Sequence, residues 1–312
     1  MAKCLVLGAN GFLGSHVTDA LVKQGHSVRV FDRFKAGTYN FQEHADIEIA
    51  AGDFLNRHDI KQAVKDIEYV FHFISTTTPA TAEDDPLIDI ETNIQMSIEL
   101  FQECVDANIK KVIFASTGGA IYGENSSEHV SENIMPLPIS PYAIGKLTIE
   151  HYLRYFQRKF GLGGLVFRIS NPYGERQSLM SKQGVIPIFL QHIAKDEPIT
   201  ILGDGSMVRD YIYVKDMAAM IVKSFEGAKE DVYNLGSGHG LSVNELVEAV
   251  RTITGKPVEA NHAKKPTTYV EKVVLDISRY TDEFPNAPQT SIEDGLKATW
   301  EYVRHRHSKG GQ

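Results

Sequence analysis

The sequence has few cysteines, no excess of positive charge and no long apolar run. Its 312 residues include only Cys4 and Cys104, which excludes the disulfide framework of small secreted domains. Both lie in apolar stretches, so we expect buried, reduced thiols in a cytoplasmic protein. A formal charge of −8 argues against non-specific nucleic-acid binding. No apolar run reaches the roughly 18 residues of a membrane span, and we expect no integral membrane segment.

Metal-ligand spacing is also missing. The 12 histidines are scattered, with no pattern such as His-Glu-x-x-His, so we predict no catalytic metal. His72 closes an apolar run, and we interpret it as a packed or hydrogen-bonding residue rather than a base.

The sequence does contain an alternation of short β-type runs and helical patterns. The predicted strands are 3–7, 27–31, 47–50, 69–74, 112–115 and 165–169, and the clearest helices are 12–23, 86–107 and 141–160. This order predicts an α/β fold with a doubly wound parallel sheet. Later elements are shorter: a strand near 199–202 and helices near 184–195, 215–226, 243–254 and 292–305. We expect domains over 1–170 and 171–312, with a soft boundary and interleaved elements.

A glycine-rich loop joins the first predicted strand to the first helix. Gly8 allows a tight turn, Gly11 lets the backbone approach a pyrophosphate, and Gly14 lets the helix pack against the strand. An anion is favoured at the helix N-terminus by free N–H groups and the helix dipole. The predicted cofactor-binding residues of this loop are Gly8, Asn10, Gly11, Phe12, Leu13 and Gly14.

Asp32 closes the second strand, 18 residues after Gly14, where a ribose-binding carboxylate is expected. A carboxylate accepts both ribose hydroxyls and repels a 2′-phosphate, which favours NAD over NADP. The positive charge of the adjacent Arg33 has the opposite effect and favours NADP. Asp53 and Phe54 follow the third strand and are candidates for the adenine end, although a turn that simply ends the strand explains them equally well.

Tyr142 and Lys146 lie four residues apart on one face of the predicted helix 141–160. Free tyrosine, with a pKa of about 10, is a poor base near neutral pH. A nearby ammonium and a positively charged nicotinamide favour the phenolate, and a shift of about three units corresponds to roughly 4 kcal/mol. Ser116 and Thr117 follow strand 112–115, at the edge where parallel sheets bind ligands, and either hydroxyl can contact a substrate oxygen.

Six motifs occur in order: the glycine loop, Asp32, the Ser116–Thr117 turn, the Tyr142/Lys146 pair, Asn-Pro-Tyr-Gly at 171–174 and Arg-Asp-Tyr-Ile-Tyr-Val at 209–214. Together they resemble the extended short-chain dehydrogenase/reductases. The nearest group is the NAD-dependent nucleotide-sugar epimerases typified by UDP-glucose 4-epimerase. The resemblance implies a Rossmann-type domain, a smaller C-terminal α/β substrate lobe and a homodimer joined through helices 86–107 and 141–160.

The resemblance also implies roles for individual residues. Tyr142 is the base, and Lys146 lowers its pKa and holds the nicotinamide ribose. Gly118 stands where many members carry a catalytic hydroxyl, which leaves Thr117, or alternatively Ser116, for that role. Lysine replaces a family arginine near residue 265, and the residue at 273 screens the sugar 2-substituent. The implied substrate-binding residues are Asn171, Arg209, Lys265 and Val273.

The expected reaction is 4-epimerisation of a nucleotide-activated hexose, UDP-Glc/UDP-Gal or UDP-GlcNAc/UDP-GalNAc, through a 4-keto sugar. A 4,6-dehydratase needs an Asp-Glu pair where Gly118-Gly119 stands. Three alternatives remain: a 4-ketoreductase, a 4-epimerase of polyprenyl-diphosphate-linked GlcNAc, and a catalytically silent NAD-binding regulator. The lipid-linked substrate would need an apolar or basic surface, for which the tail 303–307 is a candidate.

Overall fold

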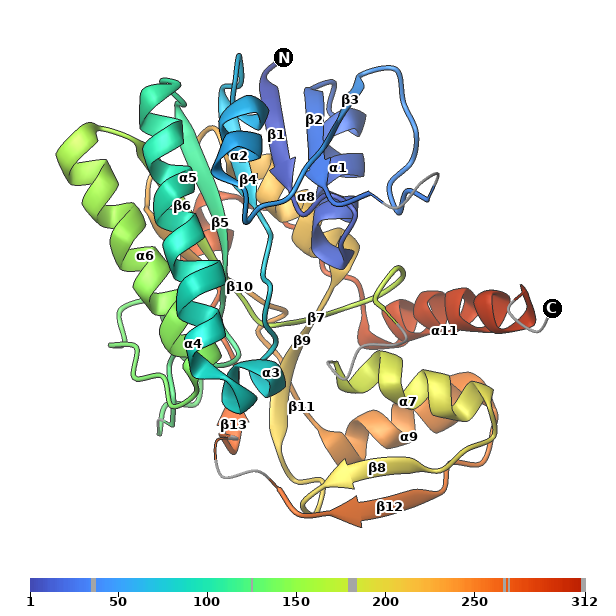
Figure 1. Ribbon diagram of the computed structural model, residues 1–312. Helices are drawn as coiled ribbons and strands as arrows, with labels where there is room; N and C mark the ends of the chain where they lie inside the picture. Colours follow the sequence, from blue (N-terminus) through green and yellow to red (C-terminus); the bar gives the residue numbers. More distant parts are fainter. Residues whose placement is uncertain (35–37, 125, 179–183, 266–267, 269, 310–312) are drawn as a thin grey trace. The chain divides into compact units, whose positions relative to one another are not determined.

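The computed structural model describes residues 1–34, 38–124, 126–178, 184–265, 268 and 270–309 (Figure 1). Two compact units are each made of three segments. The first unit comprises Met1–Thr117, Pro138–Arg168 and Ala218–Tyr233, and the second comprises Gly118–Leu137, Ile169–Met217 and Asn234–Gln312. The expected assignment of separate binding roles to 1–170 and 171–312 stays a prediction.

A parallel seven-stranded sheet of Rossmann type confirms the predicted fold class. Its strand order is β10-β6-β5-β4-β1-β2-β3. The strands are β1 (Lys3–Leu7), β2 (Ser27–Asp32), β3 (Ile47–Ala51), β4 (Tyr69–His72), β5 (Lys111–Thr117), β6 (Gly163–Ile169) and β10 (Val232–Leu235). Strands β2 and β3 lie on one side of β1, and β4 lies on its other side, so the direction in which strands are added reverses at β1. In such sheets, ligands bind at this point of reversal, beyond the carboxyl ends of the strands.

The helices of the first unit cover an apolar core. They are α1 (Phe12–Lys23), α2 (Arg57–Ala63), α3 (Pro79–Asp84), α4 (Pro86–Asp89), the π-helical turn η1 (Ile90–Ile94), α5 (Gln95–Asp106), α6 (Pro141–Phe160) and most of α8 (Val214–Ser224). Leu100, Phe101 and Phe114 are completely buried in this core. Burying a side chain of this size contributes about 1.5–3 kcal/mol. Cys4 and Cys104 are free and buried, as expected.

The predicted single helix 86–107 is wrong in its middle. The chain forms α4, η1 and α5 in succession, with the wider π-helical turn at Ile90–Ile94. There the Asn93 amide bonds to Thr77 and Asp89. The apolar residues three and four apart predict a regular α-helical repeat, and this pattern did not reveal the wider turn.

The second unit combines small sheets with three packed helices. Strand β9 (Val208–Tyr213) lies between β11 (Gly240–Ser242) and β13 (Lys272–Val273) and also pairs with β7 (Asn171–Tyr173). A separate pair joins β8 (Ile199–Leu202) to β12 (Ala260–Ala263). Helix α11 (Ile292–Lys309) packs on α7 (Val185–Ala194) and α9 (Val243–Thr254) (Figure 1). A short helix, α10, spans Ser278–Glu283. Leu190, Leu246 and Leu296 form the centre of its core.

Candidate active site

The glycine loop has the shape that a dinucleotide requires. Gly8 has a φ of +83°, and its N–H donates to Phe31 O at 2.9 Å. A Cβ at Gly14 would lie 2.2 Å from the Gly8 carbonyl oxygen, so the close packing of α1 against the loop requires glycine. Gly11 is the N-cap of α1 and supplies no side-chain hydrogen bond, which leaves the first-turn N–H groups available to an anion.

Asp32 stands beside this loop at the carboxyl end of β2. Its Oδ2 accepts from the Asn10 N–H at 3.0 Å, and its Oδ1 accepts from the Arg33 N–H at 2.8 Å. Asn10 in turn accepts from the Asn40 N–H and donates to Thr38 O. These contacts place the carboxylate next to the anion-binding turn, and the loop and Asp32 together fit NAD.

Asp53 and Phe54 form a turn after β3. The Asp53 carboxylate accepts from the Leu55 N–H at 3.0 Å and lies 4.0 Å from Arg33 Nη1. Phe54 is buried against His72, with ring centroids 5.2 Å apart, so its side chain belongs to the core. His72 Nε2 lies 2.9 Å from Ser97 Oγ, in agreement with its predicted structural role.

Tyr142 and Lys146 lie together on α6, which starts at Pro141 with Ser140 as N-cap. Lys146 is buried, and its Nζ donates to Ala115 O at 3.1 Å. The same Nζ lies 5.7 Å from the Tyr142 ring centroid and 4.9 Å from that of Phe114. The expected pairing of phenol and ammonium is therefore present at the end of β5.

The pKa of Tyr142 is shifted in the direction opposite to the one expected from the sequence. Burial, reinforced by the charge of Asp89, raises the pKa of Tyr142 to about 12. Burial lowers the pKa of Lys146 to about 8, against the opposing charges of Asp89 and Glu150. The expected lowering of the Tyr142 pKa by Lys146 is thus outweighed in the protein itself, and a phenolate near neutral pH needs further positive charge.

The two candidate hydroxyls at the end of β5 have different surroundings. Ser116 is buried, and its Oγ donates to Glu150 Oε1 at 2.5 Å. Arg168 holds Glu150, with Nη2 to Oε2 at 2.7 Å and Nε to Oε1 at 3.2 Å. Thr117 is the last residue of β5 and is only half-buried. The Ser116 hydroxyl is therefore committed to a carboxylate, whereas Thr117 lies at the strand end.

Asp89, Glu150 and Arg168 were missed at the sequence level. Arg168 carried a signal, since it is a charged residue inside an apolar strand and requires a buried partner. Glu150 lies one turn after Lys146 on the same helix, which made it a candidate partner. Asp89 had no such signal, because its neighbours Thr77, Asn93 and Gly145 come from separate elements.

The four predicted substrate residues belong to the second unit, and three gather around β9. Asn171 Nδ2 donates to Asp210 O at 2.9 Å, and Gly119 lies against its amide. Val273 pairs in register with Arg209 and is 2% exposed. Lys265 pairs instead with Glu271.

Arg209 makes contacts that the sequence did not indicate. Its Nη2 donates to Val270 O at 2.6 Å, and its Nη1 donates to Val208 O at 2.8 Å and Glu271 O at 3.3 Å. The guanidinium thus joins β9 to the segment before β13. A phosphate-binding role for Arg209 would have to share these donors.

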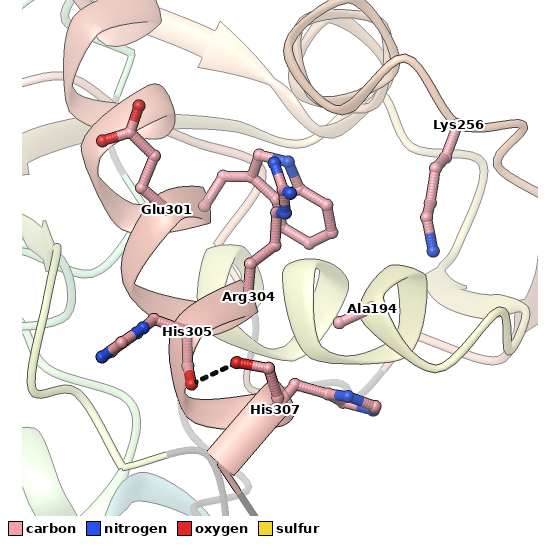
Figure 2. Close-up of a pocket in the computed structure, with 8 residues that line it drawn as sticks. Ala194, Lys256, Glu301, Arg304, His305 and His307 are labelled. Carbon is pink, nitrogen blue, oxygen red and sulfur yellow. Dashed lines mark hydrogen bonds between the residues drawn. The ribbon is translucent and has the colours of Figure 1, made fainter.

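A separate pocket of 480 Å³ lies at the ends of α7 and α11 (Figure 2). Lys256 closes one side, and its Nζ donates to Asp196 Oδ1 at 2.7 Å. None of the predicted site residues lines the pocket. Its lining is Ala194, Lys256, Trp300, Glu301, Arg304, His305, His307 and Ser308. Basic side chains at helix C-termini balance the negative end of the dipole, which accounts for much of this charge.

Among the described residues, no helix has the length and apolar character of a membrane span.

The sequence matches the family described as "NAD dependent epimerase/dehydratase" over residues 4–236. The chain belongs to this family. It is 31% identical to a putative UDP-glucose 4-epimerase of Methanocaldococcus jannaschii, over 97% of this chain and 99% of the relative. It is 30% identical to a dTDP-4-dehydro-6-deoxyglucose reductase of Escherichia coli, over 96% and 97% of the two chains.

Solved structures give the same likeness. The UDP-glucose 4-epimerase of Thermotoga maritima, solved with UDP-glucose, matches with a TM-score of 0.91 and 35% identity, over 98% of this chain and 99% of the other. The UDP-N-acetylglucosamine 4-epimerase of Methanobrevibacter ruminantium, in complex with UDP-N-acetylmuramic acid, matches with a TM-score of 0.90 and 31% identity over the same shares. This NAD-dependent family member is therefore similar to UDP-sugar 4-epimerases along nearly its whole length.

Proposed function

We propose that this protein is an NAD-dependent 4-epimerase of UDP-hexoses. The observation that carries the proposal is the Tyr142–Lys146 pair at the end of β5, with a hydroxyl at Thr117 and the NAD-binding loop in the same unit. Proton abstraction from a sugar hydroxyl needs a general base, and a nearby cation favours the charged form of that base. Tyr142 and Lys146 supply these two groups.

In the proposed mechanism, the Tyr142 phenolate takes the proton of the sugar 4-hydroxyl, and the Thr117 hydroxyl donates a hydrogen bond to the same oxygen. Lys146 stabilises the phenolate as its counter-charge. NAD⁺, when bound, supplies an acceptor for the hydride of C4 and the positive charge that favours the phenolate. Tyr142 later returns the proton after the 4-keto sugar has turned its other face. The overall reaction is redox-neutral.

The test is proton NMR of the protein with NAD⁺ and either UDP-glucose or UDP-N-acetylglucosamine. We expect galacto-configured product from at least one of them. The modest size of the Val273 side chain favours room for an N-acetyl group at the sugar 2-position. Tyr142→Phe is the matched control, because it removes one oxygen and should abolish turnover. Absence of product from both sugars in the wild type, with NAD⁺ bound, would refute the epimerase proposal.

A 4-ketoreductase is the second candidate, favoured by the similarity to the Escherichia coli reductase. It would use the same Tyr142 and Lys146 but would need net hydride supply, usually from NADPH. Asp32 opposes a 2′-phosphate. Incubation with a nucleotide 4-keto sugar and either NADH or NADPH distinguishes the two, since an epimerase consumes no stoichiometric reduced cofactor.

We also propose a homodimer through α6 and the helical segment 86–107, which comprises α4, η1 and α5. Ile144, Tyr152 and Tyr155 are exposed along one face of α6, and Leu87 and Ile88 are exposed on α4. A second copy of the chain would cover these apolar side chains. Sedimentation analysis should find a dimer that Ile144→Glu weakens. A matched control, Leu55→Glu, changes an exposed leucine elsewhere in the first unit and should leave the dimer intact.

A further inference from the structure

Asp89 is a buried carboxylate that the reaction described above does not use. It ends α4 and is 4% exposed. Its Oδ1 accepts hydrogen bonds from Asn93 Nδ2 at 2.8 Å and from Thr77 Oγ1 at 2.5 Å. Both donors are neutral, so its negative charge is not cancelled by these partners.

The other carboxylate oxygen, Oδ2, lies against the catalytic helix. A Cβ at Gly145 would be 1.9 Å from Oδ2, so α6 approaches Asp89 at a position where only glycine fits. Glycine inside a helix is unfavourable by itself, and this contact gives it a packing reason. Tyr142, Gly145 and Lys146 share one face of α6, because they are three and four residues apart. Asp89 therefore packs against the face of α6 that carries the two reacting side chains, and its charge acts on both of them.

The same network fixes the segment that carries Asp89. Asn93 lies in the π-helical turn η1, and its Oδ1 accepts from the Thr76 N–H at 2.9 Å. Its Nδ2 also donates to Thr77 Oγ1 at 2.9 Å. Irregular π-helical turns are frequent at functional sites. Here the turn ties the loop after β4 and Asp89 into one rigid unit.

Charged and titratable groups from four elements surround the Tyr142–Lys146 pair. Asp89 from α4 acts on both residues, and Glu150 from α6 acts on Lys146. Lys146 itself acts on His72 from β4, and Arg168 from β6 pairs with Glu150. Burial lowers the pKa of His72 to about 3, so it is neutral. Glu150 pairs with Arg168 at 2.7 Å and contributes to the Lys146 ammonium beside Asp89. Asp89 is thus the carboxylate in this set without a cationic hydrogen-bond partner, and its charge can serve Lys146.

We propose, on the basis of the proposed function, that Asp89 is a positioning residue that sets the packing of α6 at Gly145 and keeps Lys146 in its ammonium form. Its carboxylate opposes the effect of burial on Lys146. It also disfavours the Tyr142 phenolate. Removing the charge should therefore lower the pKa of both Lys146 and Tyr142.

The first test compares Asp89→Asn with wild type by the pH dependence of kcat/KM for UDP-glucose. Asparagine keeps an oxygen that can accept from Thr77 and Asn93. We expect both limbs of the profile to move to lower pH by half a unit or more. Asp84→Asn, an exposed aspartate at the end of α3, should leave the profile unchanged. If kcat/KM were lower at every pH while both limbs stayed at their wild-type pH values, the electrostatic role would be refuted.

A second readout does not require turnover. Lysine ammonium groups can be titrated by NMR in protein labelled with ¹³C at lysine Cε, with the Lys146 signal assigned through Lys146→Arg. The proposal expects a lower pKa for Lys146 in Asp89→Asn than in the wild type, and an equal pKa would contradict it. Because no substrate is present, this result is independent of whether the protein epimerises UDP-sugars.

The packing role is tested by coupling between two positions. Gly145→Ala would force Oδ2 away while keeping the charge, and we expect at least a tenfold loss of kcat. In an Asp89→Ala background the same glycine substitution should change kcat less than twofold, since the opposing carboxylate is gone. Equal losses in both backgrounds would show that Gly145 does not act through Asp89.

Discussion

Thr117 and Ser116 can be distinguished by removing each hydroxyl in turn. The Ser116 hydroxyl donates to Glu150 at 2.5 Å inside the core, next to a carboxylate already held by Arg168. A hydrogen bond to a charged group contributes about 1.5–3 kcal/mol. Ser116→Ala should therefore lower the free energy of unfolding by about 2 kcal/mol while leaving turnover within a few-fold of the wild type.

Thr117→Val should give the opposite pattern. Valine keeps the shape and the β-branched character that suit a strand end, so stability should change by less than about 1 kcal/mol. The lost donor to the developing oxyanion should reduce kcat about 100-fold, as removal of one such donor does elsewhere.

Urea denaturation measures the stabilities, and proton NMR of UDP-sugar conversion measures kcat for both variants. A loss of kcat in Ser116→Ala comparable to that in Thr117→Val, with stability unchanged, would refute this assignment. It would mean that the Ser116 hydroxyl leaves Glu150 during catalysis.

Three further predictions concern the cofactor and the buried charges. Asp32→Ala should weaken NAD⁺ binding at least tenfold and reduce the ratio of NAD⁺ affinity to NADP⁺ affinity, both measured by fluorescence titration. Tighter binding of NADP⁺ than of NAD⁺ by the wild type would contradict the role of Asp32. Gly14→Ala should lower NAD⁺ affinity and thermal stability, because its Cβ would meet the Gly8 carbonyl oxygen at 2.2 Å. Lys146 has a folded pKa near 8, below its unfolded value of 10.5, so its burial cost is full below pH 8 and is relieved as pH rises to 10.5. Methionine has no charge to bury, so Lys146→Met should be more stable than the wild type at pH 7. This difference in the free energy of unfolding should shrink by about 3 kcal/mol when the pH is raised to 10.5.

Much of the first unit could be predicted because its signals are local. The helices 12–23 and 141–160 have the predicted bounds, since Gly11 and Ser140 precede them and the apolar spacing is regular. Predicted strand 69–74 is shorter than expected and ends at His72. The strand β9 was not predicted, because its alternation is interrupted by Arg209 and Asp210, whose partners come from distant segments.

The candidate site was predictable in its reacting groups but not in their surroundings. Tyr142 and Lys146 are one helical turn apart in any α-helix, so their spacing alone indicates contact. The choice between Ser116 and Thr117 depends on Glu150 and Arg168, which come from other elements. Asp89 depends on a π-helical turn that leaves little trace in the sequence.

The pKa values indicate how the reacting pair is controlled. Burial raises the pKa of Tyr142 to about 12 and lowers that of Lys146 to about 8, so the protein matrix favours the neutral form of both groups. The reaction needs the opposite state, a phenolate beside an ammonium. Asp89 supports the ammonium but disfavours the phenolate, so Asp89 alone cannot produce that state. The remaining stabilisation must come from positive charge next to Tyr142, and the oxidised nicotinamide of NAD⁺ carries such a charge. On the proposed function, base strength would therefore depend on the redox state of the cofactor, with Tyr142 basic when NAD⁺ is oxidised and protonated once the hydride has been taken up.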